Sequence, residues 1–323
     1  MDRSAYEGLG TTSGTAYAPL LFKNANGWNT IFSVQNTDGV AANINVLYRQ
    51  TNTGQTWNES HTLPPNSAKI LSQAGNAQLP NGFVGSALIS CSNGQSLALS
   101  VHTEKNVWSL DYSGMNQWNV GSQASAPLLF KNYNGYNAGW QIQNLGAQAT
   151  TLNVTYRQVN GSGVWAATAN VEPGASASFD LRDNGQIPDN MVLSGAATSS
   201  NGQPLGGTVN EIKYPLNQVL NYVSPGAGNY LAAAPYMLKA VDNWRTGIQV
   251  QNLGTQTASV KLQFLDTNGG QRAVFTEGIA AGQSKTWDLA NIGNIPNGWI
   301  GSAWAYSENG QPIIAIVNEV RTQ

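Results

Sequence analysis

The sequence repeats itself with a fixed period. The segment KNANGWNTIFSVQN begins at Lys23, and similar segments begin 108 residues later at Lys131 and 108 residues later again at Lys239. The same interval separates the prolines of three Ala-Pro pairs: Pro19, Pro127 and Pro235. A solenoid unit runs about 20–50 residues, whereas a period of this length is the size of a small domain. The repeat therefore predicts three tandem domains at residues 13–120, 121–228 and 229–323, preceded by an N-terminal strand segment at residues 1–12.

Within each copy the apolar residues alternate with polar ones. Ile44, Val46 and Tyr48 show the period of two that is typical of a half-buried strand. The turns SNGQ, SNGQ and ENGQ mark a hairpin near the end of each copy. We expect about seven strands per copy, as in an immunoglobulin domain, and no long helix. The predicted fold is all-β, with three tandem immunoglobulin-like β-sandwich domains and no core disulfide, because Cys91 is the only cysteine.

Composition narrows the function classes. Charged residues make up 10% of the chain and the formal net charge is −2, without a basic patch, so nucleic acid and anionic membranes are poor partners. The chain has no apolar run of about 18 residues that would insert into a membrane. Two histidines and one cysteine are too few for a Cys/His metal cluster, and we expect no cofactor. The neutral surface, rich in Asn, Gln, Ser and Thr, is more usual in extracellular proteins. Because MDRSAYEGLG lacks an apolar signal core, an exported chain would be a mature or trimmed form.

One segment of the second copy carries a resemblance to known proteins. APLLFKNYNGYNAGWQIQNLGAQATTLNVTYRQ resembles tandem repeats of secreted or surface proteins of filamentous bacteria such as the Chloroflexota. The pattern there is P-L-hydrophobic-x-K-N-x-x-G-W-N-T-x-hydrophobic-x-V-Q-N, and the resemblance covers nearly all of each copy. The third copy departs most, with Ala240 where the others have Asn24 and Asn132. The resemblance implies an extracellular β-rich module and no more.

Aromatic residues recur at Trp28, Tyr136 and Trp244. Exposed aromatics that follow an Asn-Gly turn would be able to stack on sugar rings, as in a carbohydrate-binding module. However, Trp28 shares a strand face with Phe32 and Val34, which the pattern places in the core. The simpler interpretation is that Trp28 caps the core, and a contact between domains is a third interpretation.

A lysine recurs at the end of the predicted first strand, after three apolar residues. Surface adhesins of Gram-positive bacteria join such a lysine to an asparagine of the last strand, with an acid as catalyst, in an isopeptide bond. Two copies contain these parts: Lys131, Asn210 and Glu211, and Lys239, Asn318 and Glu319. An ion pair, or a lysine that extends its ammonium group to water, is the simpler interpretation.

The carboxylates raise the question of catalysis or calcium binding. Asp180 with Glu211, and Asp288 with Glu319, are candidate acid/base pairs, but glycoside hydrolysis needs two carboxyl groups in a cleft at a defined separation. Calcium needs several oxygen ligands close in sequence, and no Asp-rich loop is present. His61 and His102 occur in the first copy alone, so a Ser-His-Asp triad cannot recur. We expect no enzyme.

The copies differ at their ends. The first two continue past their last predicted strand with VWSLDYSGMN and QVLNYVSPGAG, whereas the third stops at VNEVRTQ. The chain begins with a similar segment, SAYEGLG, in which Tyr6 stands 13 residues before Pro19, as Tyr222 stands 13 residues before Pro235. Either such a segment is a linker or first strand of the domain that follows it, or it is the last strand of the domain before it.

The second alternative leaves the third domain without a strand and predicts an assembly. Its open sheet edge would pair with an N-terminal segment. About ten extended residues reach only about 35 Å, which is shorter than three domains in a row, so the segment would come from a neighbouring molecule. The predicted interface residues are Tyr6, Glu7, Gly8 and Leu9 of one molecule and Val317 and Val320 of the other. This head-to-tail contact does not close on itself, so it builds an open filament. We expect an extracellular structural protein, a subunit of a surface filament or sheath, whose partner is itself. A stalk or adhesin spacer, or a module that binds polysaccharide at the cell surface, is the alternative.

Overall fold

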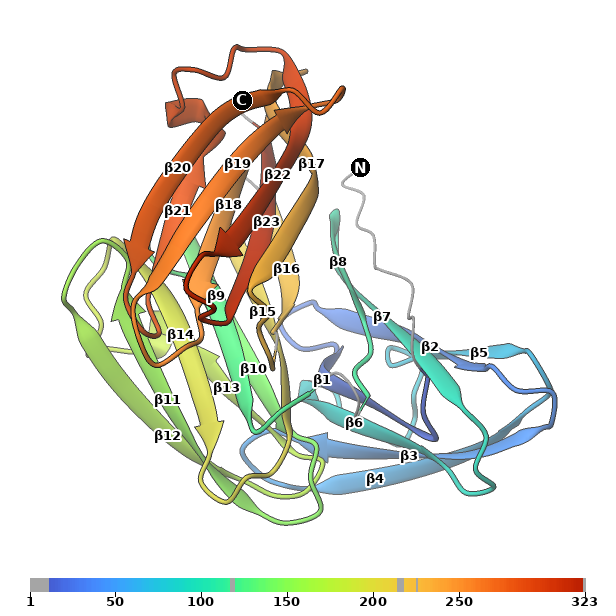
Figure 1. Cartoon of the computed structure of the whole chain (residues 1–323). Helices are drawn as coiled ribbons and strands as arrows, with labels where there is room; N and C mark the ends of the chain where they lie inside the picture. Colours follow the sequence, from blue (N-terminus) through green and yellow to red (C-terminus); the bar gives the residue numbers. More distant parts are fainter. Residues whose placement is uncertain (1–11, 117–119, 214–217, 225, 322–323) are drawn as a thin grey trace.

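The computed structural model describes residues 12–116, 120–213, 218–224 and 226–321, which form β-strands and short 3₁₀ helices (Figure 1). The all-β prediction is confirmed. Among these residues no helix is long and apolar enough to cross a membrane. The sheets arrange the strands in three successive groups, named unit 1, unit 2 and unit 3 below.

Unit 1 begins the described part of the chain. Its strands are β1 (Thr15–Lys23), β2 (Asn29–Asn36), β3 (Ala42–Gln50), β4 (Thr56–Leu63), β5 (Ala68–Ser72), β6 (Phe83–Cys91), β7 (Leu97–Lys105) and β8 (Trp108–Ser113). They form two antiparallel sheets in the orders β1-β6-β3-β4 and β5-β2-β7-β8.

Unit 2 repeats this arrangement. Its elements are β9 (Gln123–Lys131), β10 (Tyr136–Asn144), β11 (Thr150–Gln158), β12 (Val164–Val171), β13 (Ser176–Asp180), the 3₁₀ helix η1 (Leu181–Asp183), β14 (Met191–Ser199), β15 (Leu205–Lys213) and β16 (Gln218–Ser224). The sheet orders are β12-β11-β14-β9 and β13-β10-β15-β16, so each strand takes the place of its counterpart in unit 1.

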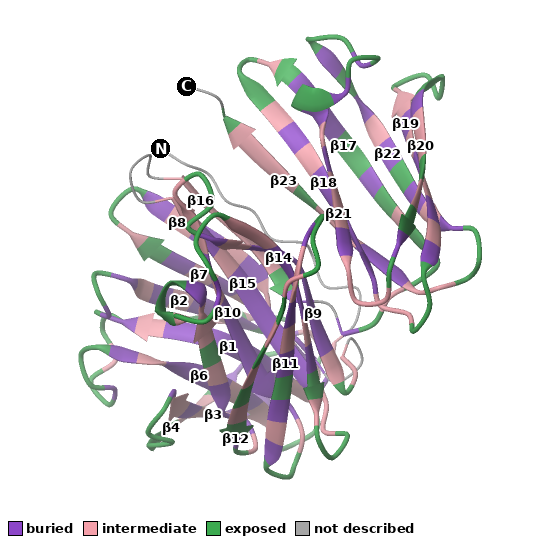
Figure 2. Cartoon of the chain, turned by 90° about the vertical axis from the view of Figure 1, so that its left-hand side faces the viewer, coloured by how far each residue is buried: buried purple, intermediate pink, exposed green. Residues whose placement is uncertain are grey.

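Unit 3 keeps this plan except at one edge. Its elements are β17 (Leu231–Val241), β18 (Trp244–Asn252), β19 (Ala258–Asp266), β20 (Gln271–Ile279), β21 (Ser284–Asp288), the 3₁₀ helix η3 (Leu289–Asn291), β22 (Trp299–Ser307) and β23 (Ile313–Arg321). β17 pairs with β22 and, through its last residues, also with β18, which joins the two layers. β23 pairs with β18, and no strand of the described residues pairs with its other side (Figure 2).

The strand order departs from the predicted immunoglobulin arrangement. In that fold the first strand pairs in the sheet of the second, and the seventh pairs in the sheet of the sixth. Here β1 pairs with β6, and β7 pairs with β2, so the first and seventh strands have exchanged sheets. The sequence could not decide this, because alternation shows that a strand has one buried face but not which sheet it joins.

Each unit has its own apolar core between its two layers. Large aromatic side chains fill the centres: Phe32, Tyr48 and Phe83 in unit 1, Trp140 and Tyr156 in unit 2, and Phe264 in unit 3. The predicted alternation of Ile44, Val46 and Tyr48 places all three inside, since each is at most 2% exposed. The period-two pattern therefore builds the cores.

A β-bulge interrupts the first strand of every unit at its Ala-Pro pair. The register shifts between Ala18 and Leu21 in β1, and β9 and β17 shift at the same place. Proline has no N–H to give to the ladder, which explains a bulge at this position. The residue after the proline, Leu20 in unit 1, consequently has no partner in the neighbouring strand.

The segments between the copies are resolved as last strands of the preceding unit. β8 pairs with β7 along its length, and β16 pairs with β15 in the same way. They are therefore neither linkers nor first strands of the following unit. Unit 3 has no counterpart of β8 and β16 among the described residues.

Candidate functional site

The recurring lysines hold loops in place. Lys23 Nζ donates to the carbonyl oxygens of Asn76 at 2.5 Å and Leu79 at 2.7 Å. The two later lysines donate to carbonyl oxygens at the equivalent loop: Lys131 Nζ to Arg182 at 2.9 Å and Lys239 Nζ to Ile292 at 2.7 Å. All three are buried. Each ammonium group thus ties the first strand to the segment after the fifth. Lys131 Nζ also forms an ion pair with Asp189 at 3.9 Å, as one interpretation from the sequence proposed for these lysines.

The candidate isopeptide residues have other partners. Among the described residues, no hydrogen bond or ion pair joins Lys131 to Asn210 or Glu211, or Lys239 to Asn318 or Glu319. Instead, Asn318 Nδ2 of unit 3 donates to Glu211 Oε2 of unit 2 at 2.8 Å. The asparagine and the glutamate therefore connect two units.

Glu211 is a fully buried carboxyl group at the junction of unit 2 and unit 3. Burial raises its pKa to about 8, although the hydrogen bond from Asn318 opposes this. Its second oxygen, Oε1, has no hydrogen-bond partner in the described structure. Tyr136 and Tyr222 have raised pKa values, mainly through burial and also through the charge of Glu211. The raised pKa favours the protonated form, in which the group is a neutral polar contact between units.

Asp180 and Asp288 cap the short 3₁₀ helices. Asp180 accepts from the backbone N–H of Arg182 at 2.9 Å and also pairs with the Arg182 guanidinium group. Asp288 accepts from Ala290 N–H at 2.9 Å and lies 3.7 Å from Arg245. Among the described residues, Asp180 forms no hydrogen bond with Glu211, and Asp288 forms none with Glu319. Within the described part of the chain, no cluster of three or more His, Cys, Asp or Glu side chains is placed to hold a metal ion.

The recurring aromatics lie at or near the unit junctions. Trp28 is 6% exposed and packs on Trp108, with ring centroids 5.6 Å apart, in a cluster that Ile212 and Val219 of unit 2 also contact. Trp28 therefore takes part in a contact between unit 1 and unit 2. Its ring is too little exposed to stack on a sugar. Tyr136 is half-buried and donates its hydroxyl to Gln218 at 2.6 Å.

Trp244 is the exposed member of this aromatic set. It is 38% exposed, and the Arg321 guanidinium group lies 6.0 Å from its ring centroid. In unit 1 the corresponding ring is covered by Trp108 of β8. Trp244 is thus exposed in the unit for which the described part of the chain provides no counterpart of β8.

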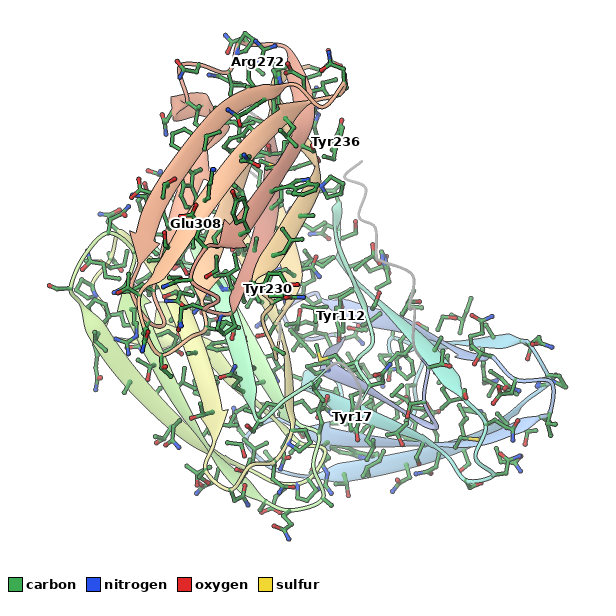
Figure 3. The ribbon with its side chains drawn as sticks, viewed as in Figure 1. Tyr17, Tyr112, Tyr230, Tyr236, Arg272 and Glu308 are labelled. Carbon is green, nitrogen blue, oxygen red and sulfur yellow. The ribbon has the colours of Figure 1, made fainter. Side chains whose placement is uncertain are left out.

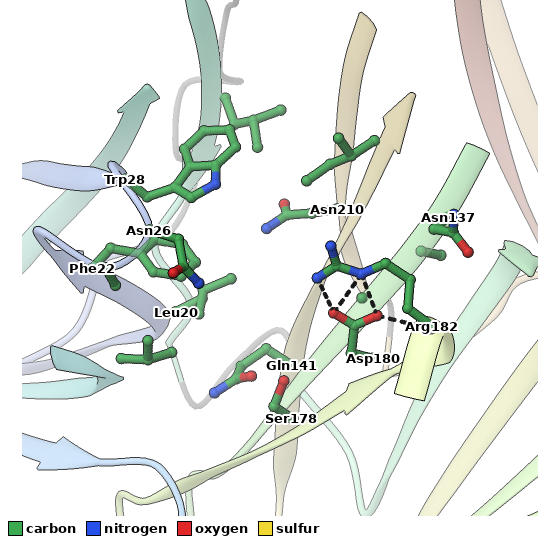
Figure 4. A pocket seen from close by; sticks show the side chains of 16 residues that line it. Leu20, Phe22, Asn26, Trp28, Asn137, Gln141, Ser178, Asp180, Arg182 and Asn210 are labelled. Carbon is green, nitrogen blue, oxygen red and sulfur yellow. Dashed lines mark hydrogen bonds and ion pairs between the residues drawn. The ribbon is translucent and has the colours of Figure 1, made fainter. Parts of the chain in front are cut away.

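A cavity of about 490 Å³ lies between unit 1 and unit 2 (Figure 4). Leu20, Phe22 and Trp28 form an apolar side of it, and Asn210 points into it from unit 2. Its charged lining residues, Asp180 and Arg182, neutralise each other. The cavity therefore offers no unpaired charge to a ligand.

The bulge of the first strand is closed by a tyrosine of the last strand. Tyr112 Oη of β8 donates to Leu20 O at 2.8 Å and accepts from Leu20 N–H at 3.4 Å. Tyr222 Oη of β16 makes the same two bonds with Leu128, at 2.5 and 3.3 Å. Sequence reasoning missed this contact, although the recurrence of a tyrosine before each Ala-Pro pair was a visible signal.

In unit 3 this bulge and the neighbouring sheet edge are uncovered. The residue after its proline, Tyr236, is 53% exposed and lies on the outside of the unit (Figure 3). Val317 of β23 is 36% exposed, whereas the equivalent Val101 and Val209 are at most 1% exposed. Val320, also predicted at this edge, is half-buried. The predicted donor residues, Tyr6, Glu7, Gly8 and Leu9, lie outside the described residues.

Comparison with known proteins gives weak resemblances. No protein-family model matches the sequence, and no curated protein gives a significant match. Among solved structures, Thermotoga maritima 1070 is similar to 33% of this chain over 94% of its own length, with 15% identity and a TM-score of 0.28. The tetra-tandem repeat in the extending region of a large adhesion protein is similar to 96% of this chain over 75% of its own length, with 12% identity and a TM-score of 0.19. At these TM-scores neither resemblance bears on function.

Proposed function

We propose that this chain is an extracellular structural protein, a subunit of a surface filament or sheath. Subunits assemble head to tail, and the N-terminal segment of one molecule completes unit 3 of its neighbour. The observation that carries the proposal is the edge of β23: among the described residues no strand pairs there, whereas β8 and β16 do so in the other units. An open strand edge is a template for pairing with another chain.

The exposed positions of unit 3 match those that the last strand covers elsewhere. Val317 occupies the position of Val101, which pairs with Tyr112, and of Val209, which pairs with Tyr222. Tyr236 presents the bulge that the tyrosine hydroxyl closes in unit 1 and unit 2. A donated strand that places a tyrosine opposite Val317 would satisfy both positions.

The N-terminal segment contains the tyrosine of such a strand. If the segment paired in the register of the other units, Tyr6 would lie opposite Val317. In unit 1, Trp108 stands four residues before Tyr112 and pairs with Lys105, the last residue of β7. This register sets Asp2 opposite Arg321, and cross-strand pairs of opposite charge stabilise a sheet.

Electron microscopy of the intact chain beside a chain without residues 1–12 tests the proposal. Filaments from the first and monomers from the second are the expected result. A synthetic peptide of residues 1–12 should bind the shortened chain, and the same peptide with Tyr6→Ala should bind more weakly.

A second variant separates a missing strand from a general folding defect. Residues 106–114, which form the turn and β8 of unit 1, are appended after Arg321 of the intact chain. Unit 3 should then complete itself, and the variant should remain monomeric and folded. Monomers from the native chain at every concentration, without binding of the peptide, would refute the proposal and favour a spacer or a glycan-binding module.

A further inference from the structure

The two junctions inside the chain share two hydrogen bonds at equivalent positions. At the first, Ser86 Oγ of unit 1 donates to Gly174 O of unit 2 at 2.9 Å, and Gln143 Nε2 donates back to Ala87 O at 3.1 Å. At the second, the equivalent bonds join Ser194 to Gly282 at 2.9 Å and Gln251 to Gly195 at 3.0 Å. Every residue of the second set lies 108 positions after its counterpart. Unit 2 therefore sits on unit 1 as unit 3 sits on unit 2.

The residues that would make a third such junction are present, and two of them are more exposed than their counterparts. Ser302 and Ala303 of unit 3 are the counterparts of the donor serine and acceptor carbonyl, and Ser302 is half-buried where Ser86 and Ser194 are fully buried. At the other end, Gln35 of unit 1 is the counterpart of the two junction glutamines. Those glutamines are fully buried, whereas Gln35 is exposed.

The outer face of unit 3 around Ser302 is apolar. Tyr236 is 53% exposed, Ile300 41% and Trp304 47%. The counterparts of Tyr236 in the other units, Leu20 and Leu128, are buried, at 8% and 6% exposure. An exposed apolar group of this kind marks an interaction surface, and here the equivalent positions show what covers it.

We propose that this face of unit 3, formed by Tyr236, Ile300, Ser302 and Trp304, binds unit 1 of a second copy of the chain. The contact repeats the internal junctions, with Gln35 donating to Ala303 O and Ser302 donating to Asn66 O. The proposal rests on the head-to-tail assembly above and adds its second contact surface. It also fits the donated strand, because Tyr6 precedes its Ala-Pro pair by nearly the same length of chain as Tyr112 and Tyr222 do.

Among the four positions that would form these bonds, only Asn66 has a residue type found at neither internal junction, and the residue facing it changes as well. Asn66 replaces the junction glycines but keeps their left-handed backbone, with φ of 54° against 72° and 74°. A Cβ added to Gly282 would lie 2.8 Å from Arg157 Nε of the preceding unit, and it would have to shift that side chain. At the counterpart position unit 3 has the shorter Leu265, so the side chain of Asn66 meets no arginine.

A disulfide between two molecules tests the docking. A Cβ built on Gly174 lies 3.7 Å from Leu88 Cβ, within the range of about 3.5–4.5 Å that a disulfide requires. The counterparts at the proposed contact are Asn66 and Trp304. We therefore mix a chain carrying Asn66→Cys with a chain carrying Trp304→Cys, both with Cys91→Ser, under mild oxidation.

The expected product is a covalent dimer of the two variants. A single chain with Leu88→Cys and Gly174→Cys should form the internal disulfide and serves as the positive control. Mixing Trp304→Cys with Thr53→Cys, which is exposed elsewhere on unit 1, should give no more dimer than chance collisions.

The outcomes separate docking from strand donation. Filaments of the native chain without the specific dimer would overturn the docking and leave strand donation standing. A specific dimer from chains without residues 1–12 would support docking even where the donated strand is absent. Absence of the dimer, of filaments and of peptide binding would overturn both.

Discussion

Replacing Glu211 by glutamine should remove a pH dependence of stability that the native protein carries. The carboxyl group is fully buried, and burial raises its pKa to about 8. The unfolded chain ionises near the ordinary value of 4.5. Because the unfolded state loses its proton first, the stability is fully present below about pH 4.5 and is lost as the pH rises towards the folded pKa.

The size of the effect follows from the two pKa values. One unit of difference between the folded and unfolded pKa corresponds to about 1.4 kcal/mol. Between about pH 5 and pH 8, the free energy of unfolding should fall by about 3–4 kcal/mol on account of this one group. Glutamine is neutral throughout this range and keeps an oxygen that accepts from Asn318, so it imitates the protonated acid.

Urea unfolding of the native chain and of Glu211→Gln across this pH range measures the difference. The two proteins should be close in stability at the acidic end, and the variant should be the more stable at the alkaline end. Glu319→Gln, at the equivalent but half-buried position of unit 3, is the matched control. If the free energy of unfolding of the native protein and of Glu211→Gln changed with pH in parallel, ionisation of Glu211 would not destabilise the folded state. That result would refute the prediction.

Two further predictions concern contacts that the repeats share. Tyr112→Phe should lower the free energy of unfolding by about 1–3 kcal/mol, because it leaves the Leu20 bulge without its hydroxyl partner. Tyr133→Phe, on an exposed ring, should change the free energy of unfolding little. Equal effects of the two variants in urea unfolding would contradict the role of the Tyr112 hydroxyl. Lys131→Met should lower the free energy of unfolding by a similar amount, because it removes the donor to Arg182 O. In mass spectrometry the native chain should have the full mass of its sequence, because an isopeptide bond would reduce the mass by one ammonia.

The sequence predicted the parts of the fold that depend on periodicity. Alternation placed Ile44, Val46 and Tyr48 in the core, and the interval of 108 residues gave each strand of unit 2 its counterpart in unit 1. Both signals can be read from the sequence without knowledge of which strands pair. The pairing of β1 with β6 is a long-range choice between sheets, and the pattern contains no information on it.

The candidate site residues were harder to predict because their partners lie in loops and neighbouring units. Lys131 meets a carbonyl of the segment after β13, and Trp28 meets β8 together with unit 2. Neither partner is close in sequence. The recurrence of these residues did show that they matter to each copy. However, every residue has a backbone carbonyl, so the residue type does not reveal which carbonyl accepts the hydrogen bond.

The internal junctions also explain why strand donation and docking would strengthen each other. The donated segment leads directly into β1 of the molecule whose unit 1 carries Gln35, so binding of the segment holds that unit beside unit 3 at a high effective concentration. Docking then becomes an intramolecular step, and a face of modest affinity suffices. Because the same placement of one unit on the next is used twice within the chain, its repetition between chains would be head-to-tail and open. A filament built this way would have one geometry along its whole length, and the free peptide of residues 1–12 should bind unit 3 more weakly than the same segment attached to unit 1.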